Sequence, residues 1–270
     1  MRPGDSTRRD HRRRARRSTQ EVGGSTRVKA ILTYHSIDES GSVISTSLDD
    51  FTRQLAQLET AGVEVVPLAD VVDAEAPAIA ITFDDGYVNF AEAAWPRLRK
   101  RGWPATVFAV TELLGQTNSW ESGPAAGLPL LGASELRDLI REGVAVGCHS
   151  ARHISLRGVS AETFQRETVQ ARERLEESLE VPIRSFAYPF GHLHGRLDDT
   201  LREAFDQIVT TQFALIESNT SPWDLPRLDA FYFRGNDRLA GLLRPGFANW
   251  VRRRRALRAF RSRLRRWRRV

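Results

Sequence analysis

The chain has 270 residues, of which 41% are hydrophobic and 27% are charged, so it can bury a substantial core, and whole-chain disorder is excluded. Its single cysteine, Cys148, excludes an intramolecular disulfide framework and a multi-cysteine zinc finger. The net charge of +6 comes from the two ends, because residues 1–17 carry eight arginines and residues 250–270 carry eleven, whereas the segment between them has a net charge of −11. The basic composition therefore gives no evidence that the central segment binds nucleic acid.

The first 27 residues consist largely of Arg, Ser, Thr and Gly, a composition that predicts a disordered basic arm. No apolar run of the kind that an export signal needs follows the arginines, and no stretch approaches the roughly 20 apolar residues that span a bilayer. We therefore expect a cytoplasmic protein with no signal peptide and no transmembrane segment.

From Val28 onward, short apolar runs alternate with segments of helical period. Strands are predicted at residues 28–34, 63–66, 78–83, 105–110, 144–148, 184–188 and 207–211. Helices are predicted over residues 48–61, 91–101, 134–141, 160–179 and 197–205. This alternation is typical of βα units around a parallel sheet. It favours a closed or nearly closed α/β barrel over residues 28–249, with an open doubly wound sheet as the alternative.

Two adjacent carboxylates, Asp84 and Asp85, directly follow the uniformly apolar strand at residues 78–83. Burial of carboxylates at the C-terminal end of a strand costs free energy unless something binds or protonates them. In barrel enzymes, the active site lies at this end of the strands. The pair is followed by Gly86, so a solvated turn is an equally good interpretation of this segment alone.

A second predicted strand, at residues 144–148, ends at His149 and His153. Two imidazoles at this spacing can converge on one ion, and one carboxylate would complete a set of three ligands with open positions for water or substrate. A lone histidine is more often structural. Two of them at the same end of the sheet as an Asp pair favour a metal site.

A third strand end carries Tyr188, Pro189, Phe190 and Gly191. Pro and Gly favour a tight loop, and its backbone N–H groups are the kind of donor that a developing oxyanion needs. On its own, the segment is better explained as an aromatic turn that caps the core.

Taken together, residues 82–86 (Thr-Phe-Asp-Asp-Gly), 149–153 (His-Ser-Ala-Arg-His) and 188–191 (Tyr-Pro-Phe-Gly) resemble the motifs of the polysaccharide deacetylase family. This family is also called the NodB-homology or carbohydrate esterase 4 group. The three motifs occur in the family's order, each at a predicted strand end, and the resemblance covers residues 28–235. It implies a distorted (β/α)7 barrel that removes N-acetyl, or sometimes O-acetyl, groups from carbohydrate.

The resemblance also implies roles for individual residues. Asp84 would be the general base, and Asp85, His149 and His153 would bind a divalent metal, with zinc expected first and cobalt, nickel or manganese as alternatives. The oxyanion would rest on the metal and on the backbone N–H of Phe190, in a substrate-binding loop that includes Tyr188 and Pro189.

Two departures from the family pattern lead to further assignments. The usual Leu-x-x-His segment, which supplies a general acid, is missing after His194, whereas the first strand reads Tyr-His and looks like the circularly permuted branch. We therefore assign the acid to His35, with a histidine that only caps this strand as the alternative. The usual Arg before the third motif's Pro is also missing, and Arg227 is our candidate for the cation that steers Asp84. An ion pair between Arg227 and Asp229 explains this arginine equally well.

The C-terminal segment, residues 250–270, predicts an amphipathic helix. Its apolar side is formed by Trp250, Leu257, Phe260, Leu264 and Trp267, and the remainder is largely Arg. A cationic helix of this kind is typical of a segment that lies in an anionic membrane surface, here the inner face of the membrane. A solvated tail and a helix docked on the acidic barrel are the alternatives.

The sequence thus predicts a metal-dependent deacetylase of N-acetylated carbohydrate, whether polysaccharide, oligosaccharide or lipid-linked sugar. One alternative is a catalytically inactive carbohydrate-binding or membrane-binding module on the same fold. A non-haem Fe(II) oxygenase would use the same ligand set but leaves Asp84 and His35 without a role. No base-reading module is apparent in the central segment, so we do not expect a specific nucleic-acid partner.

Overall fold

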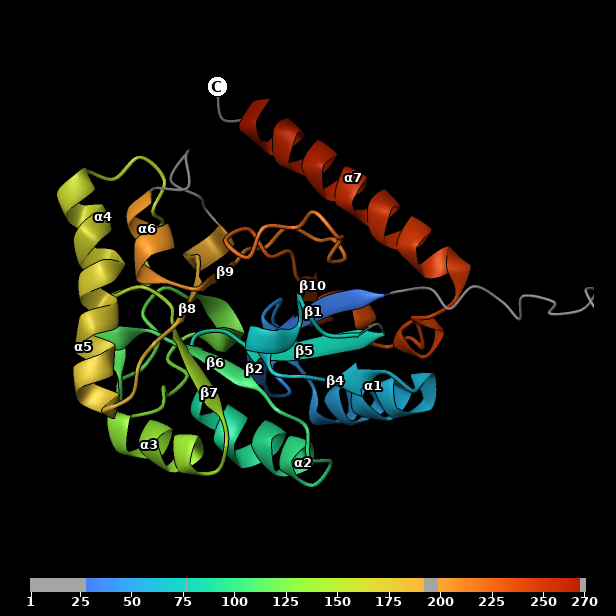
Figure 1. Ribbon diagram of the computed structural model, residues 1–270, viewed down its shortest axis with the longest axis horizontal. Coiled ribbons are helices and arrows are strands. Elements are labelled where there is room, and N and C mark those ends of the chain that lie inside the picture. The colour runs from blue at the N-terminus through green and yellow to red at the C-terminus, as the bar shows by residue number, and fades with distance from the viewer. Residues whose placement is uncertain (1–27, 76, 192–198, 268–270) are drawn as a thin grey trace, which may run out of the picture.

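The computed structural model describes residues 28–75, 77–191 and 199–267 of the chain, with side chains up to residue 260. The predicted basic arm at residues 1–27 lies outside the described residues, as do His192 and His194. The described chain forms a curled parallel sheet with helices packed around it (Figure 1).

The sheet has eight strands, which pair in parallel in the order β10-β1-β5-β6-β7-β8-β9, with β4 beside the first residues of β5. The strands are β1 (Lys29–Tyr34), β4 (Glu64–Val65), β5 (Ala78–Phe83), β6 (Thr106–Ala109), β7 (Ala145–Cys148), β8 (Ser185–Ala187), β9 (Gln207–Val209) and β10 (Leu228–Asp229). An isolated parallel bridge joins Val209 of β9 to Leu225, which lies just before β10. The first and last strands of the order therefore approach each other. The predicted barrel is therefore confirmed, in a distorted and incompletely closed form.

Each of the seven predicted strands contains an observed strand. Three further strands have no counterpart in the prediction: β10 and the separate pair β2 (Ser36–Ile37) and β3 (Ser45–Thr46). Each of these is two residues long, which is too short to show an alternation of apolar and polar residues.

The helices follow the strands in the βα order expected of a barrel. They are α1 (Leu48–Ala61), α2 (Trp95–Arg99), α3 (Ala133–Arg141), α4 (Ala161–Glu167), α5 (Val169–Leu179), α6 (Asp199–Ala204) and α7 (Pro245–Trp267). Helix α1 has the predicted bounds, because the Ser47 hydroxyl accepts the Asp50 N–H at its start and Gly62 takes a left-handed conformation at its end. The helix predicted at 91–101 begins as a π-helical segment (Phe90–Ala94), and the one predicted at 160–179 is broken at Thr168.

The core explains why β5 is apolar at five of its six positions; the exception, Thr82, donates its hydroxyl to the Leu32 carbonyl. Alternate residues of this strand, such as Ile79 and Ile81, pack against the outer helices, whereas Ala78 and Ala80 face the inside of the barrel with Ile31 and Phe108. All six residues of β5 are buried. A strand that is covered on both faces stabilises the fold through every side chain, at about 0.8 kcal/mol for each buried methylene.

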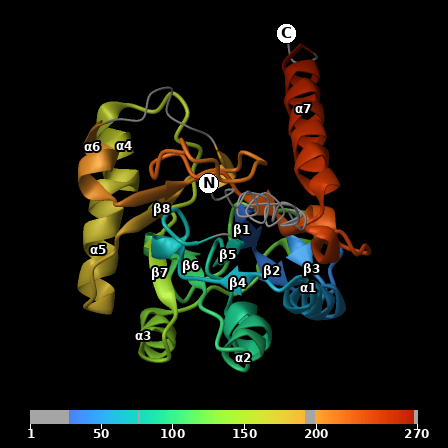
Figure 2. The same cartoon turned by 45° about the vertical axis from the view of Figure 1, so that its right-hand side comes forward.

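Helix α7 begins at Pro245, five residues before the predicted amphipathic segment, and its first turns pack on the body. Phe247 and Val251 are buried, and the Trp250 ring lies 5.5 Å from that of Phe233. The helix then projects away from the sheet, as Figures 1 and 2 show. Within the described part of the chain, no helix is both long enough and apolar enough to cross a membrane.

Candidate metal centre and active site

The parallel strands bring the predicted site residues to one edge of the sheet, because β1, β5, β7 and β8 all end there. His35 follows β1, Asp84 and Asp85 follow β5, and His149 follows β7. The remaining motif follows β8 and begins at Tyr188. In a barrel, residues at this edge come from distant parts of the sequence and share one mouth.

Asp85, His149 and His153 form a compact, buried group. Their candidate ligand atoms all lie within 4.8 Å of one another, and Asp85 Oδ1 is 3.3 Å from His149 Nε2 and 3.2 Å from His153 Nε2. It is the only such group of His, Cys, Asp and Glu among the described residues. Two imidazole nitrogens and one carboxylate oxygen are the donor set that catalytic zinc sites use, so these residues fit a divalent metal.

Local backbone geometry aims these three side chains inward. Asp85 and Gly86 both have positive φ, which turns the chain sharply where β5 ends. Ser150 and His153 also have left-handed backbones, in the turn that separates the two imidazoles. Non-glycine residues in this conformation are strained, and such strain concentrates at functional sites.

Hydrogen bonds and charges around Asp85, His149 and His153 favour the binding of a cation. His149 Nδ1 lies 2.8 Å from the carbonyl oxygen of Ala187, so its Nε2 is left to face Asp85. Burial alone would raise the pKa of Asp85, but the charge of His153 and hydrogen bonds from both histidines hold it well below its ordinary value. The carboxylate therefore stays ionised, as a metal ligand must.

Arg227 reaches Asp84 with two parallel hydrogen bonds. Its Nη1 and Nη2 donate to the two carboxylate oxygens at 2.6 and 2.7 Å, and its Nε donates to the Thr210 carbonyl at 3.0 Å. Both side chains are buried. Burial raises the pKa of Asp84, but the charges of Arg227 and His149 outweigh it and lower the pKa below its ordinary value.

The other interpretation of Arg227, an ion pair with Asp229, does not match the contacts. Asp229 accepts the backbone N–H of Phe231 and lies 3.7 Å from Arg258 of α7. Arg227 therefore pairs with Asp84, although the two residues are 143 positions apart, and its role as the cation that steers Asp84 stays a prediction.

His35 lies at the same mouth, with its Nε2 3.9 Å from Asp84 Oδ2 and its side chain one quarter exposed. Strand β1 pairs with β5 along its whole length, which brings residue 35 level with residue 84. His35 is therefore close enough to Asp84 for both side chains to act on one bound group.

The third motif forms a tight loop against the metal-binding group. Tyr188 and Pro189 are buried, whereas Phe190 has a positive φ and its ring packs edge-on against His153 at 4.6 Å. Gly191 also has a positive φ, and a Cβ placed there would lie 1.8 Å from the Thr211 hydroxyl. Only glycine therefore fits this position.

The structure adds residues that the sequence interpretation missed. The Trp120 ring stacks on His153, with centroids 4.1 Å apart and planes 28° apart. Its neighbour Glu121 has a pKa raised by burial and by the charge of Asp85, and the same two causes raise the pKa of Tyr87. Residues 115–131 form a long loop between β6 and α3, and the length of this loop is the one sequence signal for these neighbours.

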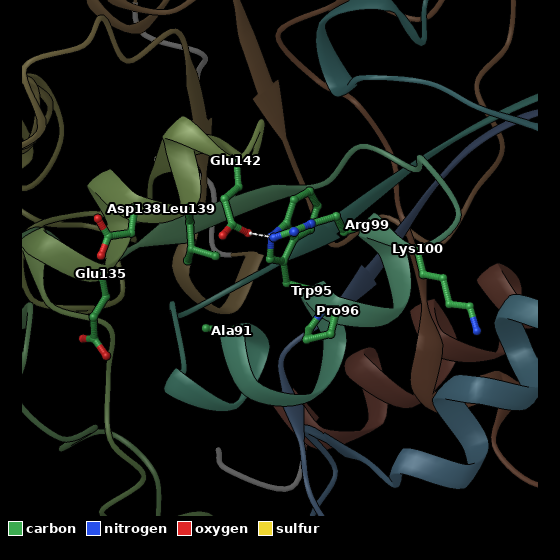
Figure 3. A pocket seen from close by; sticks show the side chains of 9 residues that line it. All are labelled: Ala91, Trp95, Pro96, Arg99, Lys100, Glu135, Asp138, Leu139 and Glu142. Atoms are coloured by element: carbon green, nitrogen blue, oxygen red, sulfur yellow. Dashed lines mark hydrogen bonds and ion pairs between the residues drawn. The ribbon is translucent and has the colours of Figure 1, made fainter.

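A surface groove elsewhere on the molecule contains none of these residues. It lies between α2 and α3, where Trp95 donates to Glu142 and Arg99 pairs with the same carboxylate (Figure 3). This groove belongs to the outer helical layer.

A comparison with known protein families agrees with the barrel fold and with the buried group of Asp85, His149 and His153. The model of the family described as polysaccharide deacetylase matches residues 72–208, which is half of the chain. The chain therefore belongs to the polysaccharide deacetylase family. The match includes all three motifs but neither β1 nor β10. The circularly permuted order and the roles of the individual site residues stay predictions.

Three similar proteins share less than a quarter of their aligned residues with this chain. YxkH of Bacillus subtilis (strain 168), named for the same family, is 23% identical over 193 residues, which cover 67% of this chain and 64% of YxkH. The deacetylase PplD of Streptococcus pyogenes, solved in complex with acetate, is 23% identical, with a TM-score of 0.63 over 75% of this chain and 92% of its own. IcaB from Ammonifex degensii is 23% identical, with a TM-score of 0.67 over 80% and 97%. These likenesses confirm the fold.

Proposed function

We propose that this protein is a metal-dependent hydrolase that removes acetyl groups from N-acetylated carbohydrate, whether polysaccharide, oligosaccharide or lipid-linked sugar. The observation that carries the proposal is the placement of Asp85, His149 and His153 within 4.8 Å of one another beside the arginine-paired Asp84. Family membership supports the substrate class, and the acetate in the PplD structure is what deacetylation would release.

Asp85, His149 and His153 would hold the metal, with zinc expected first and cobalt, nickel or manganese as alternatives. A bound divalent cation at this position supplies a Lewis acid and lowers the pKa of a water molecule. The fixed Nε2 atom of His149 and the ionised Asp85 are the features of the chain that favour this cation.

Asp84 is the general base in this mechanism. Arg227 occupies one side of the carboxylate with both of its Nη groups, which orients the carboxylate and keeps it ionised. The remaining lone pairs of Asp84 can accept the proton of the attacking water.

His35 is the general acid. An amide nitrogen is a poor leaving group until it is protonated, so cleavage needs a proton donor near the departing amine. The imidazole of His35 is partly exposed at the mouth and 3.9 Å from Asp84, where it can deliver this proton. The backbone N–H of Phe190 is assigned to the oxyanion, within the substrate-binding loop that includes Tyr188 and Pro189.

The test is acetate release from a panel of N-acetylated sugars, measured before chelation, after chelation and after zinc is added back. The proposal predicts release that chelation abolishes and zinc restores. Binding of the sugars without release would instead favour the inactive binding module. Oxygen-dependent turnover with added Fe(II) would favour the oxygenase, for which the Asp84–Arg227 pair has no use.

The proposal includes a partner for the C-terminal segment: an anionic membrane surface at the cytoplasmic face, contacted through residues 250–270. Beyond the docked first turns of α7, Leu257 and Phe260 are 52% and 60% exposed, and the segment carries eleven arginines and no acidic residue. Arg254 and Arg258 instead lie over the ring of Tyr232 in the body. Contacts with the barrel therefore involve one side of the helix and leave Leu257 and Phe260 exposed.

Co-sedimentation with vesicles that contain anionic lipid tests this partner. The double variant Leu257→Ser/Phe260→Ser is expected to bind at least several-fold more weakly than the full chain. Val43→Ser is the matched control, because Val43 is 70% exposed but lies outside α7. Equal binding by all three proteins would remove the membrane from the proposal.

A further inference from the structure

The turn that carries His149 and His153 is held by two neighbouring segments, residues 111–112 and Glu167. Ser150 and His153 adopt left-handed backbones in this turn, a strained conformation that non-glycine residues keep only when the surrounding structure holds them. The carbonyls of Ser150 and Ala151 accept N–H groups from residues 111 and 112, and the Ser150 hydroxyl accepts the His153 N–H. The N–H groups of Ala151 and Arg152 point to a single residue, Glu167.

Glu167 reaches the turn because the helix that contains it is broken. Thr168 has φ −122° and ψ −80°, which separates α4 from α5 at this point. At the break, the backbone carbonyl of Glu167 accepts the N–H of Ala151 at 3.2 Å. The break in the helix therefore lets residue 167 contact the turn with its backbone as well as its side chain.

The side chain of Glu167 is fully buried and makes three contacts with one residue of the turn. Its Oε2 accepts the backbone N–H of Arg152 at 3.0 Å, and its Oε1 lies 2.9 Å from Nε and 2.8 Å from Nη2 of the same arginine. A buried carboxylate needs a partner charge, and Arg152 lies between the two histidines in sequence. The cost of burying Glu167 is thus offset only when the turn has its observed conformation.

We infer that Glu167 is a positioning residue that sets the geometry of His149 and His153 for the metal, acting through Ala151 and Arg152. This inference rests on the proposed metal site. Partners that orient metal ligands commonly change metal affinity by 10–100-fold when they are altered.

The main variant is Glu167→Gln, which keeps the shape but places an amide N–H₂ group against the donors of Arg152. We expect zinc affinity, measured by competition with a chromogenic chelator, to fall roughly 10–100-fold, and the absorption spectrum of the cobalt-loaded protein to change. Glu112→Gln is the control, because Glu112 also lies near Arg152, at 3.8 Å, but its carboxylate accepts no backbone N–H of the turn. Its zinc affinity should stay within about twofold of the wild type.

A second variant covers the case in which Glu167→Gln does not fold. Arg152→Gln removes the guanidinium from a partly exposed position, keeps the backbone N–H, and should weaken zinc binding roughly tenfold. Folded variants with lower thermal stability but unchanged zinc affinity would overturn the inference, since Glu167 would then be structural only. A wild-type protein that binds no zinc would instead overturn the proposed metal site.

Discussion

Arg227 donates two hydrogen bonds to Asp84 in the interior of the barrel, across 143 positions of sequence. The arginine precedes β10 and the aspartate follows β5, and β1 lies between these two strands in the sheet. The pair fixes the orientation of the Asp84 carboxylate and keeps it ionised. It is the contact on which the assignment of Asp84 depends.

Replacement of Asp84 separates its role from that of the metal ligands. Asp84→Asn keeps the shape of the side chain but removes the base, so the deacetylation rate should fall about 10²–10⁴-fold while zinc binding is retained. His149→Ala should lose both zinc and activity. Steady-state acetate release and metal content measure the two effects. A near-wild-type rate for Asp84→Asn would show that another group takes the proton.

Replacement of Arg227 leaves a buried carboxylate without its partner. Arg227→Met should lower the free energy of unfolding by about 3–5 kcal/mol, because Asp84 then carries an uncompensated buried charge. The loss should be smaller when Asp84→Asn is also present, since the second change removes that charge. Chemical denaturation of the four proteins of this cycle measures the coupling.

The exposed pair of Arg141 and Asp138 provides the control for this cycle. Arg141→Met removes an ion pair from the surface and should change stability by less than about 1 kcal/mol. If Arg227→Met were no more destabilising than Arg141→Met, the buried pair would not be the stabilising contact that the structure shows.

The two histidines should respond differently to pH. Burial lowers the pKa of His149, but hydrogen bonding to Asp85 and the charges of Asp84 and Asp85 outweigh it and raise the pKa above 6.5. Burial lowers the pKa of His153, and this lowering prevails over the effect of Asp85. At pH values below this raised pKa, His149 carries a proton in the metal-free protein, and this proton must leave before Nε2 can bind zinc.

We expect zinc binding to release a proton at pH values below the raised pKa of His149, and zinc affinity to fall as the pH drops through this pKa. In the metal-free protein, the free energy of unfolding depends on pH in the opposite direction. The protonated pair with Asp85 stabilises the fold at low pH and loses this contribution as the pH rises through the same pKa. Calorimetry in buffers of different ionisation enthalpy counts the protons, and binding without proton release would contradict the assigned state of His149.

Gly191 tests the close packing of the loop that carries Phe190. Gly191→Ala adds a Cβ that would overlap the Thr211 side chain, so the loop must move and deacetylation should fall at least tenfold. Gly158→Ala is the matched control, since Gly158 has a similar positive φ but nothing within 4 Å of the added Cβ. It should cost about 1 kcal/mol of stability and leave the rate unchanged. Equal activity of the two variants would mean that the loop tolerates displacement.

Much of the fold and of the metal group is predictable from sequence, because the relevant signals are local. Apolar strands that end in charged residues identify β5 and β7, and parallel pairing then requires Asp85 and His149 to share one edge. The positive φ at Asp85 and His153, which aims the side chains, leaves no mark in the sequence because those residue types do not require it.

The contacts that sequence leaves open are those between distant segments. The choice between Asp84 and Asp229 as partner of Arg227 depends on the position of β10, a two-residue strand without a period. The stacking of Trp120 on His153 depends on the path of a long loop. The break at Thr168 interrupts a continuous helical pattern, because contacts with the histidine turn outweigh local helix propensity there.

A crystal structure of the zinc-soaked protein, with anomalous diffraction recorded at the zinc edge, tests whether Asp85, His149 and His153 form a metal site. We expect one ion about 2.0–2.2 Å from His149 Nε2, His153 Nε2 and a carboxylate oxygen of Asp85, with Asp84 held by Arg227 and not among the ligands. An ion bound elsewhere, or none at a zinc concentration that restores activity, would contradict it.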